Sequence, residues 1–394
     1  MLYTWESEIN EWSSWLPYVV DSIKSLKSID DIESSFEMNT AIIISWSILA
    51  RGSDALLNSS IDFELLFLDE SHYAKSFKAK RTKVACRLAN KCESVVLLTG
   101  TPLRNCAIDL FPQLYMVAPE VFSDFNDFAR SYSPPREKVI RSNAFKVYDQ
   151  SINMDELRIA SKPFLIFRKK KDVLKDLPSK RYRRLDLSPS RGTEAEWETI
   201  IDHMNSDSDS IDGSELIAHR QQGGKETAKQ IAAWIDDNSS TSNPLVVFLV
   251  HKQVRMILER ELRVRGIHFV AIVGSTPAYM RTRHIRNFQQ GKIQVLICSE
   301  AGKEGITLTR ACGLIQLERF WVPADEEQAE ARIWRIGQER PVIITQVHMK
   351  GTIDDFIVSK LARKRKVVSE LFSDTLYDET LLSKFLNRYP GGSR

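Results

Sequence analysis

Residues 65 to 76 read LLFLDESHYAKS, and residues 94 to 102 read SVVLLTGTP. In the first stretch four apolar residues run into two acids, which predicts a buried parallel strand with carboxylates at its end. Asp69 is the candidate ligand of a metal ion, and Glu70 is the candidate base that orients a water molecule. The second stretch predicts another apolar strand, which ends in a polar turn. Together the two strand ends predict a site for a magnesium-bound nucleotide in an α/β protein.

Composition sets the broad class of the protein. Of the 394 residues, 43% are hydrophobic and 27% are charged, which predicts a soluble globular protein of two or more domains. The longest apolar run, residues 41 to 50, is too short to span a bilayer, so no membrane partner is expected. The N-terminal residues lack the pattern of a secretion signal. Five cysteines without a CxxC pair predict reduced thiols, hence a cytoplasmic protein in a prokaryotic or viral setting, or a nuclear one in a eukaryote.

Positive charge is concentrated in short runs, although the net charge is only +3. The runs are RKKKDVLK at 168 to 175, KRYRR at 180 to 184, RMILERELRVR at 255 to 265 and LARKRK at 361 to 366. Each run taken alone is explained as well by a solvated helix face or a basic linker as by contact with a phosphate backbone. Charge alone therefore does not decide whether the protein binds nucleic acid.

Changes of pattern along the chain predict four segments. Residues 1 to 185 alternate apolar strands with amphipathic helices, as in an α/β lobe, and include a helical protrusion. Residues 186 to 243 are predicted to be a helical linker region between polar loops, and residues 244 to 350 a second α/β lobe. Residues 351 to 394 are predicted to form a helical tail.

The order of the motifs resembles that of a known family, the Swi/Snf-type DNA translocases of helicase superfamily two. The matching stretches are LYTWESEINEW (2 to 12), AIIISWSIL (41 to 49), DESHYAK (69 to 75), LLTGTPLRN (97 to 105), PLVVFLVHKQV (244 to 254), SEAGKEGITLTRA (299 to 311) and QAEARIWRIGQ (328 to 338), which are similar to motifs Ia to VI. The compact linker is most similar to that of annealing-helicase, bacterial and viral members. The resemblance implies an α/β fold of two RecA-like lobes with parallel sheets and helical insertions.

One expected element is missing. The family carries a phosphate loop of the form G-x-x-x-x-G-K-[ST] upstream of motif Ia, and none of the three Gly-Lys pairs in this sequence has that spacing. We therefore expect the first lobe to lack its N-terminal phosphate-loop strand, and the 394-residue chain alone not to hydrolyse ATP.

The resemblance also implies roles for individual residues. The residues carried over are catalytic Asp69, Glu70, His72, Arg332 and Arg335, of which Asp69 and Glu70 face the metal; nucleotide-binding Gly305 and Gln338; and DNA-binding Ser45, Trp46, Thr101, Arg104, Lys303 and Thr307. Arg332 and Arg335 are expected three apart on a helix, where both guanidinium groups can reach a γ-phosphate. The alternative for the two arginines is ion pairing with Glu326, Glu327 or Glu330, and the alternative for Trp46 is a core position. Ala331 and Trp334 depart from the Asp and His that are common in the family.

The resemblance thus implies ATP and Mg²⁺ as cofactors, duplex or branched DNA as the partner, and DNA-dependent ATP hydrolysis as the activity. Three hypotheses remain open. A separate chain, or sequence upstream, supplies the phosphate loop; or the chain is an inactive DNA-binding module; or it is a degenerate fragment.

Overall fold

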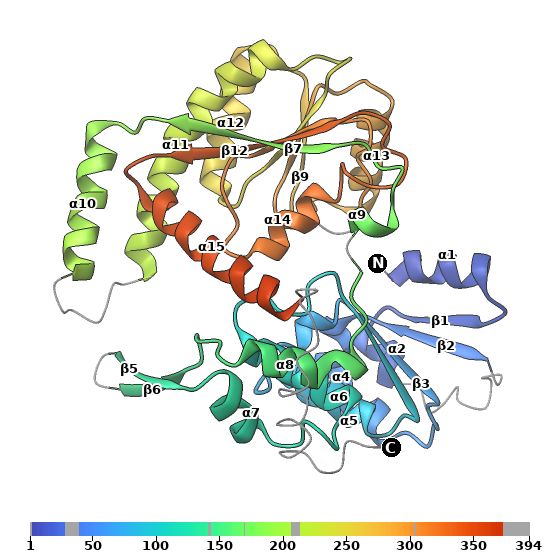
Figure 1. Cartoon of the computed structure of the whole chain (residues 1–394). Coiled ribbons are helices and arrows are strands. Elements are labelled where there is room, and N and C mark those ends of the chain that lie inside the picture. Colours follow the sequence, from blue (N-terminus) through green and yellow to red (C-terminus); the bar gives the residue numbers. More distant parts are fainter. Residues whose placement is uncertain are drawn as a thin grey trace. The chain divides into compact units, whose positions relative to one another are not determined.

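The structure is a computed structural model that describes residues 2–27, 39–140, 143–168, 170–205, 213–302 and 305–372. The chain divides into two compact units, coloured by sequence in Figure 1. Unit 1 comprises Met1–Arg136, Lys146–Ile166 and Val367–Arg394, and unit 2 comprises Glu137–Phe145 and Phe167–Lys366. The four-segment division expected from the sequence stays a prediction.

Unit 1 alternates strands and helices along most of its length. Its elements are α1 (Leu2–Trp12), β1 (Leu16–Val20), α2 (Ile23–Lys27), β2 (Thr40–Ile44), α4 (Trp46–Asn58), β3 (Leu65–Asp69), α5 (Lys80–Ala89), β4 (Ser94–Leu98), α6 (Phe111–Val117), α7 (Phe125–Tyr132) and α8 (Met154–Ser161). In the described residues its strands form two parallel pairs, β1 with β2 and β3 with β4. Aromatic and aliphatic side chains of α6, α7 and α8 form one core, and Met116 of α6 packs in a second cluster with Leu68 of β3.

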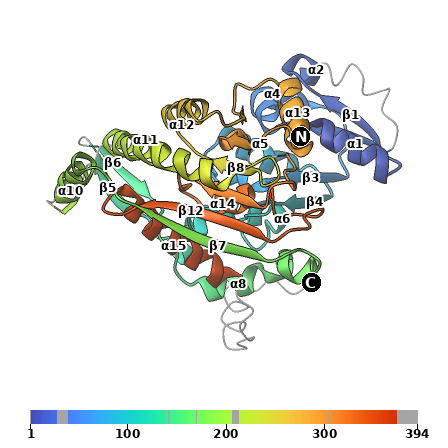
Figure 2. The same cartoon turned by 90° about the horizontal axis from the view of Figure 1, so that it is seen from above.

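Unit 2 contains a six-stranded parallel sheet. Its elements are α9 (Lys170–Val173), β7 (Lys180–Leu187), α10 (Arg191–Asn205), α11 (Gly213–Asn238), β8 (Leu245–Phe248), α12 (Lys252–Val264), β9 (Phe269–Ile272), α13 (Ala278–Gln289), β10 (Val295–Cys298), β11 (Gly313–Gln316), α14 (Pro323–Glu330), β12 (Val342–Met349) and α15 (Ile353–Leu371), whose last turn belongs to unit 1. The strand order is β7-β12-β11-β8-β10-β9, and β7 and β12 run side by side in both views (Figure 1 and Figure 2).

The two faces of this sheet are both covered. Val247 of β8 packs into one apolar cluster with α11 and α12, whereas its neighbours Val246 and Phe248 pack into a second cluster on the opposite face. Side chains alternate across a strand, so a strand that is apolar at every position must be buried on both faces. All four residues of β8, and all four of β10, are indeed buried.

The sequence-based fold class, α/β with parallel sheets, is confirmed. The expected helical protrusion within residues 111 to 162 also contains two short paired strands, β5 (Arg136–Ile140) and β6 (Asn143–Val147), which the sequence pattern did not predict. Of the expected helical tail, α15 covers Ile353–Leu371, and residues 373 to 394 lie outside the described residues.

Candidate functional site

The first group of predicted residues lies where β3 and β4 end. The two strands pair in parallel with Asp69 opposite Leu98, so the residues that follow them leave the same edge of the sheet. Glu70 adopts a left-handed backbone conformation, with φ 50° and ψ 47°, and starts the short 3₁₀ helix Ser71–Ala74. Left-handed backbone is costly for a residue with a side chain, and such strain is concentrated at functional sites.

His72 connects the two strand ends. Its Nδ1 lies 3.1 Å from Glu70 Oε2 and 3.0 Å from Thr99 Oγ1, and the imidazole is 1% exposed. The Thr99 hydroxyl in turn accepts a hydrogen bond of 3.0 Å from the Thr101 backbone N–H. One buried histidine therefore holds the acidic turn after β3 against the Thr-Gly-Thr-Pro turn after β4.

Both oxygens of the Asp69 carboxylate already accept hydrogen bonds. Trp5 Nε1 of α1 donates to Oδ2 over 3.0 Å, and the Glu70 backbone N–H donates to Oδ1 over 2.9 Å. A carboxylate offers about four lone-pair positions, so room for a metal ligand remains. The contact from Trp5, which sequence reasoning assigned no role at this site, holds the carboxylate in one orientation.

Four residues that are predicted to bind DNA lie near these strand ends, where they form contacts within the protein. Ser45 caps α4 by accepting a hydrogen bond from the Ile48 backbone N–H, and Trp46 donates from Nε1 to the Asp69 carbonyl over 2.9 Å while packing on two apolar clusters. Thr101 is buried. Arg104 lies beside Asp109; burial raises the pKa of Asp109, and the charges of Lys75 and Arg104 oppose that rise. Their DNA-binding roles stay predictions.

Gln113, a residue that no motif marks, contacts both turns. Gln113 of α6 accepts a hydrogen bond of 2.8 Å from the Ser71 hydroxyl, and its amide donates to the Pro102 carbonyl over 2.7 Å. Gln113 is 4% exposed, so its amide is satisfied by these contacts within the protein. No residue pattern marks such a brace, because it depends on packing between α6 and the two strand ends.

The second group, in unit 2, contains the two arginines. The spacing predicts a helix through Arg332 and Arg335, and this expectation is wrong: α14 ends at Glu330. Beyond Glu330 the N–H groups of Arg332 and Ile333 bond to the carbonyls of Ala329 and Glu330, three residues back, and the Arg332 carbonyl accepts from the Leu308 N–H. The guanidinium groups nevertheless converge, because both donate from their Nη1 to the Ile306 carbonyl over 3.3 Å.

Two of the three acids proposed as alternative partners of these arginines, Glu326 and Glu330, pair with other residues. Glu326 is fully buried and pairs with Arg319 at 2.6 Å and with Arg365 at 2.6 Å. Glu330 pairs with Lys180 at 2.8 Å and accepts from the Tyr182 hydroxyl at 2.7 Å.

Further positive charge lies beside the arginines. Lys170 of α9 donates to the Trp334 carbonyl, and its Nζ lies 5.0 Å from the centre of the Trp334 ring. Burial, and then the charges of Arg335, Lys180 and Arg332, lower the pKa of Lys170 to about 8. The charges of three neighbouring cations thus act on one half-buried lysine, and one of the three, Lys180, is itself paired with Glu330.

Gly305 and Gln338 are both predicted to bind nucleotide. In the structure the first is marked by its backbone conformation and the second by the hydrogen bonds of its side chain. Gly305 has φ +66°, a conformation that glycine adopts without strain, and it directly precedes the carbonyl that the arginines share. Gln338 is 6% exposed, and its amide donates to the carbonyls of Thr309, Ala311 and Ile333 over 2.8 to 3.0 Å. Gln338 thus ties the loops of motifs V and VI together, and its contact with a nucleotide stays a prediction.

The remaining two predicted residues belong to motif V. Thr307 is half-buried next to the shared carbonyl of Ile306. Lys303 lies outside the described residues. A DNA contact for either residue stays a prediction.

No group of three or more His, Cys, Asp or Glu side chains able to hold a metal ion occurs in the described ranges. None of the helices there is long and apolar enough to cross a bilayer.

Comparisons with known proteins identify the two halves of the chain. Residues 1–232 match the model of the SNF2-related domain, and residues 226–337 match that of the helicase conserved C-terminal domain. The chain is 28% identical over 349 residues to the SWI/SNF-related matrix-associated actin-dependent regulator of chromatin subfamily A-like protein 1 of Drosophila melanogaster, covering 86% of this chain and 45% of that protein. It is 26% identical over 384 residues to the DNA annealing helicase and endonuclease ZRANB3 of Bos taurus, covering 93% of this chain and 35% of that protein.

The chain therefore spans less than half the length of these two relatives. Among solved structures, the C-terminal part of the Fun30 ATPase domain matches with 26% identity and a TM-score of 0.33, over 50% of this chain and 62% of that one.

Proposed function

The chain belongs to the family defined by an SNF2-related domain, here followed by a helicase conserved C-terminal domain, and we propose that it is part of an ATP-dependent DNA translocase. The observation that carries the proposal is the coupling of two strand ends through one histidine. His72 contacts both Glu70 and Thr99, so the acidic turn and the Thr-Gly-Thr-Pro turn form one polar surface at the edge of β3 and β4.

The carboxylates of this surface fit a magnesium nucleotide better than a bare metal ion. Mg²⁺ keeps several waters and is usually held by one or two carboxylates together with substrate phosphates. Asp69 and Glu70 would supply those carboxylates, and no cluster of three ligands is present in the described residues. Bound Mg²⁺ would neutralise charge on the phosphates. Asp69 would hold the ion, and Glu70 would accept a proton from the attacking water.

In unit 2, Arg332 and Arg335 are proposed to stabilise the negative charge that develops on the γ-phosphate. Support comes from their shared contact with the Ile306 carbonyl, which aims both guanidinium groups in one direction. The Ile306 carbonyl is a neutral acceptor, and a phosphate oxygen would form a stronger, charge-assisted hydrogen bond with the same guanidinium groups.

The proposed substrate is duplex or branched DNA. The named activity of the bovine relative, a DNA annealing helicase, supports this assignment. Contacts would be mainly to the phosphate backbone and therefore independent of sequence and sensitive to salt.

Turnover also requires a phosphate loop, which these 394 residues do not contain. We propose that another polypeptide, or sequence outside these residues, supplies it together with a further strand. Support comes from β3 and β4, which are apolar but only partly buried: Phe67 is 48% exposed and Leu98 is 38% exposed. A neighbouring strand would cover them.

The test is ATP hydrolysis by the purified chain, with and without duplex DNA, and with and without a polypeptide that carries a strand and a G-x-x-x-x-G-K-[ST] loop. We expect DNA-stimulated hydrolysis only when the loop polypeptide is present. A loop polypeptide with Ala in place of its Lys is the control and should give no activity. Hydrolysis by the chain alone would contradict the proposed source of the phosphate loop.

The alternative that the same assay tests is DNA binding without ATP turnover. It predicts the same salt-sensitive affinity for duplex DNA, but no hydrolysis with any loop polypeptide. The two functions are therefore separated by the same assay once DNA binding has been measured in parallel.

A further inference from the structure

Unit 2 contains an open cavity that is lined by none of the residues proposed to bind nucleotide. Its volume is about 450 Å³, and it lies between α10 and the turn that leads from β12 into α15. We call it the α10–α15 groove; it is lined by Glu194, Trp197, Glu198, Ile201, Gly351, Asp355 and Phe356. A volume of this size falls within the range of about 300 to 1,000 Å³ found for ligand pockets.

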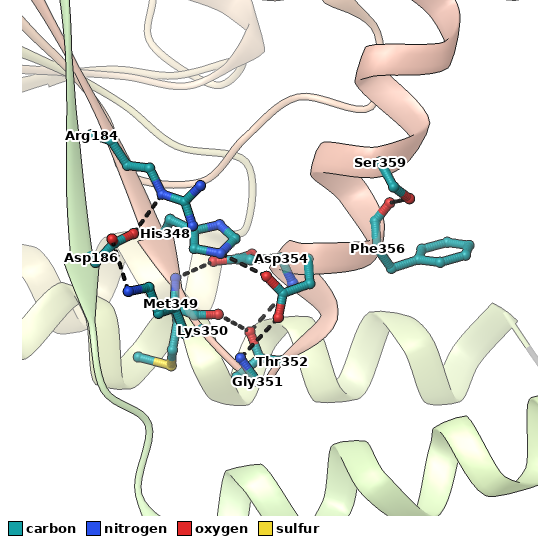
Figure 3. Close-up of polar contacts among 11 residues, drawn as sticks. Arg184, Asp186, His348, Met349, Lys350, Gly351, Thr352, Asp354, Phe356 and Ser359 are labelled. Carbon is teal, nitrogen blue, oxygen red and sulfur yellow. Dashed lines mark hydrogen bonds and ion pairs between the residues drawn. The ribbon is translucent and has the colours of Figure 1, made fainter.

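The α15 wall of the groove is held by a hydrogen-bond network, shown in Figure 3. His348 Nε2 lies 2.8 Å from Asp355 Oδ1, and the Gly351 N–H donates to Asp355 Oδ2 over 2.9 Å. The Met349 N–H donates to the neighbouring carboxylate, Asp354, over 3.0 Å. In the same view the Phe356 side chain points away from this network, so the ring takes no part in these hydrogen bonds.

Hydrogen bonds and apolar packing also hold the α10 wall in place. Glu226 of α11 accepts hydrogen bonds from the Ser190 and Thr193 hydroxyls, at 2.8 Å and 2.6 Å, which fixes the first turn of α10. Further along α10, Trp197 is 5% exposed and packs in a small apolar core with Ile353 and Ile357 of α15. Both walls are thus in place before anything binds, which reduces the ordering cost of binding.

Acidic side chains border the groove on α10. Glu194 and Glu198 line the groove, and Asp202 lies one turn beyond them; all three are exposed, and their spacing of four residues puts them on one face of the helix. Within the described residues none of the three has an ion pair or a hydrogen bond from its side chain. Like charges at this spacing repel one another and weaken the helix, so a cationic partner would relieve the repulsion.

We propose that the α10–α15 groove binds a basic peptide segment of a partner protein, which places an apolar side chain on Trp197, Ile201 and Phe356 and cationic side chains against the acids of α10. The groove combines the two features that such a segment recognises. Its floor is apolar and partly open, since Ile201 is 36% exposed, and its rim carries negative charge.

The spacing of the rim favours a peptide over a small cation. Four residues of α-helix rise about 6 Å, and the three acids therefore extend over about 12 Å. An extended peptide repeats every two residues, or about 6.6 to 6.8 Å, so its alternate side chains fall close to the spacing of the acids. A single small cation would meet only one or two of them.

The test is fluorescence anisotropy with a labelled ten-residue peptide of alternating lysine and leucine, measured without nucleotide or DNA. The result is therefore independent of whether the protein hydrolyses ATP. We expect the double variant Glu194→Gln/Glu198→Gln to bind about five- to tenfold more weakly, and Ile201→Ser about tenfold more weakly. Raising the salt concentration should weaken wild-type binding and change that of the double variant less.

A matched control is Asp236→Asn/Asp237→Asn, which also removes two exposed acids from unit 2 but lies at the far end of α11. It should bind within twofold of wild type, and circular dichroism should show all variants folded. Equal binding of a peptide with serine in place of leucine would overturn the proposal, since only diffuse charge would then act. Wild-type self-association that the double variant abolishes would also overturn it, because a second copy of the chain would be the occupant.

Discussion

Strands β3 and β4 of unit 1 and strands β8 and β10 of unit 2 are similarly apolar, yet they differ in burial. Every residue of β8 and β10 is at most 4% exposed, because each strand has a hydrogen-bonded neighbour on both sides and helices on both faces. In the described residues β3 and β4 pair only with each other, and Phe67 and Leu98 are substantially exposed. An apolar run therefore identifies a strand, whereas its burial depends on the neighbours that the sheet provides.

The difference has a physical consequence. A strand with an unpaired edge presents free N–H and C=O groups and invites a further strand. We infer that the sheet of unit 2 is complete in itself and that the β3–β4 pair gains stability from an added strand.

The largest expected effect is on catalysis at the edge of β3 and β4. In the assembly with the loop polypeptide, Glu70→Gln should lower kcat for ATP by about 10² to 10⁴, because it removes the proton acceptor. Glu64→Gln, an exposed acid at the other end of β3, is the matched control and should leave kcat unchanged. Full turnover by Glu70→Gln would remove that residue from the mechanism.

The next effect compares one leucine in each sheet. Leu296→Ala in β10 deletes a fully buried side chain and should destabilise unit 2 by about 2 to 5 kcal/mol. Leu98→Ala in β4 should destabilise unit 1 by less than about 1 kcal/mol, because 38% of that residue is already exposed. Denaturant titrations read by hydrogen exchange in each unit separate the two values. Equal losses would refute the difference in sheet completeness.

A smaller effect concerns Gln338, for which two roles compete. Gln338→Ala leaves the carbonyls of Thr309, Ala311 and Ile333 without their donor, at a cost of about 1 to 3 kcal/mol to unit 2. If the glutamine acts only as a tie between loops, KM for ATP should change far less than thermal stability. A large rise in KM with unchanged stability would instead support the predicted nucleotide contact.

The smallest effect is on pH dependence. The pKa of Lys170 is lowered from 10.5 to about 8, so between these values the unfolded chain binds more protons than the folded one. Stability should therefore rise with pH from about 8 towards 10.5. The measurement is the Tm of the wild type minus the Tm of Lys170→Met from pH 7 to 9.5. The subtraction removes the contribution of other groups that titrate at high pH, such as Tyr182. A difference that is flat with pH would show that Lys170 is not perturbed.

Much of the fold could be predicted from the sequence, because it depends on local pattern. The strands Leu65–Asp69 and Ser94–Leu98 follow directly from apolar runs, and the family was recognised from its motifs and then confirmed by the match over residues 1–232. The course of the chain after Glu330 was not predictable, since it includes a hydrogen bond between the Arg332 carbonyl and the Leu308 N–H, which are distant in sequence.

The sequence predicts candidate site residues, whose roles stay predictions, but it does not predict the contacts that support them. Asp69, Glu70 and His72 stand in one motif, whereas the contact of Trp5 with Asp69 spans 64 positions and that of Ser71 with Gln113 spans 42. Such contacts arise from packing between elements. No pattern in the sequence around Trp5 or Gln113 predicts these contacts.

The measurement that tests the central claim most directly is amide hydrogen exchange at Leu65–Asp69 and Ser94–Leu98, with and without the loop polypeptide. Exchange at Leu245–Phe248 and Val295–Cys298 is the internal reference. We predict that the first two strands exchange much faster than the reference strands in the chain alone and become protected when the loop polypeptide binds, while the reference strands do not change. Protection of β3 and β4 equal to that of β8 and β10 in the chain alone, or no gain when ATP hydrolysis appears, would contradict the account.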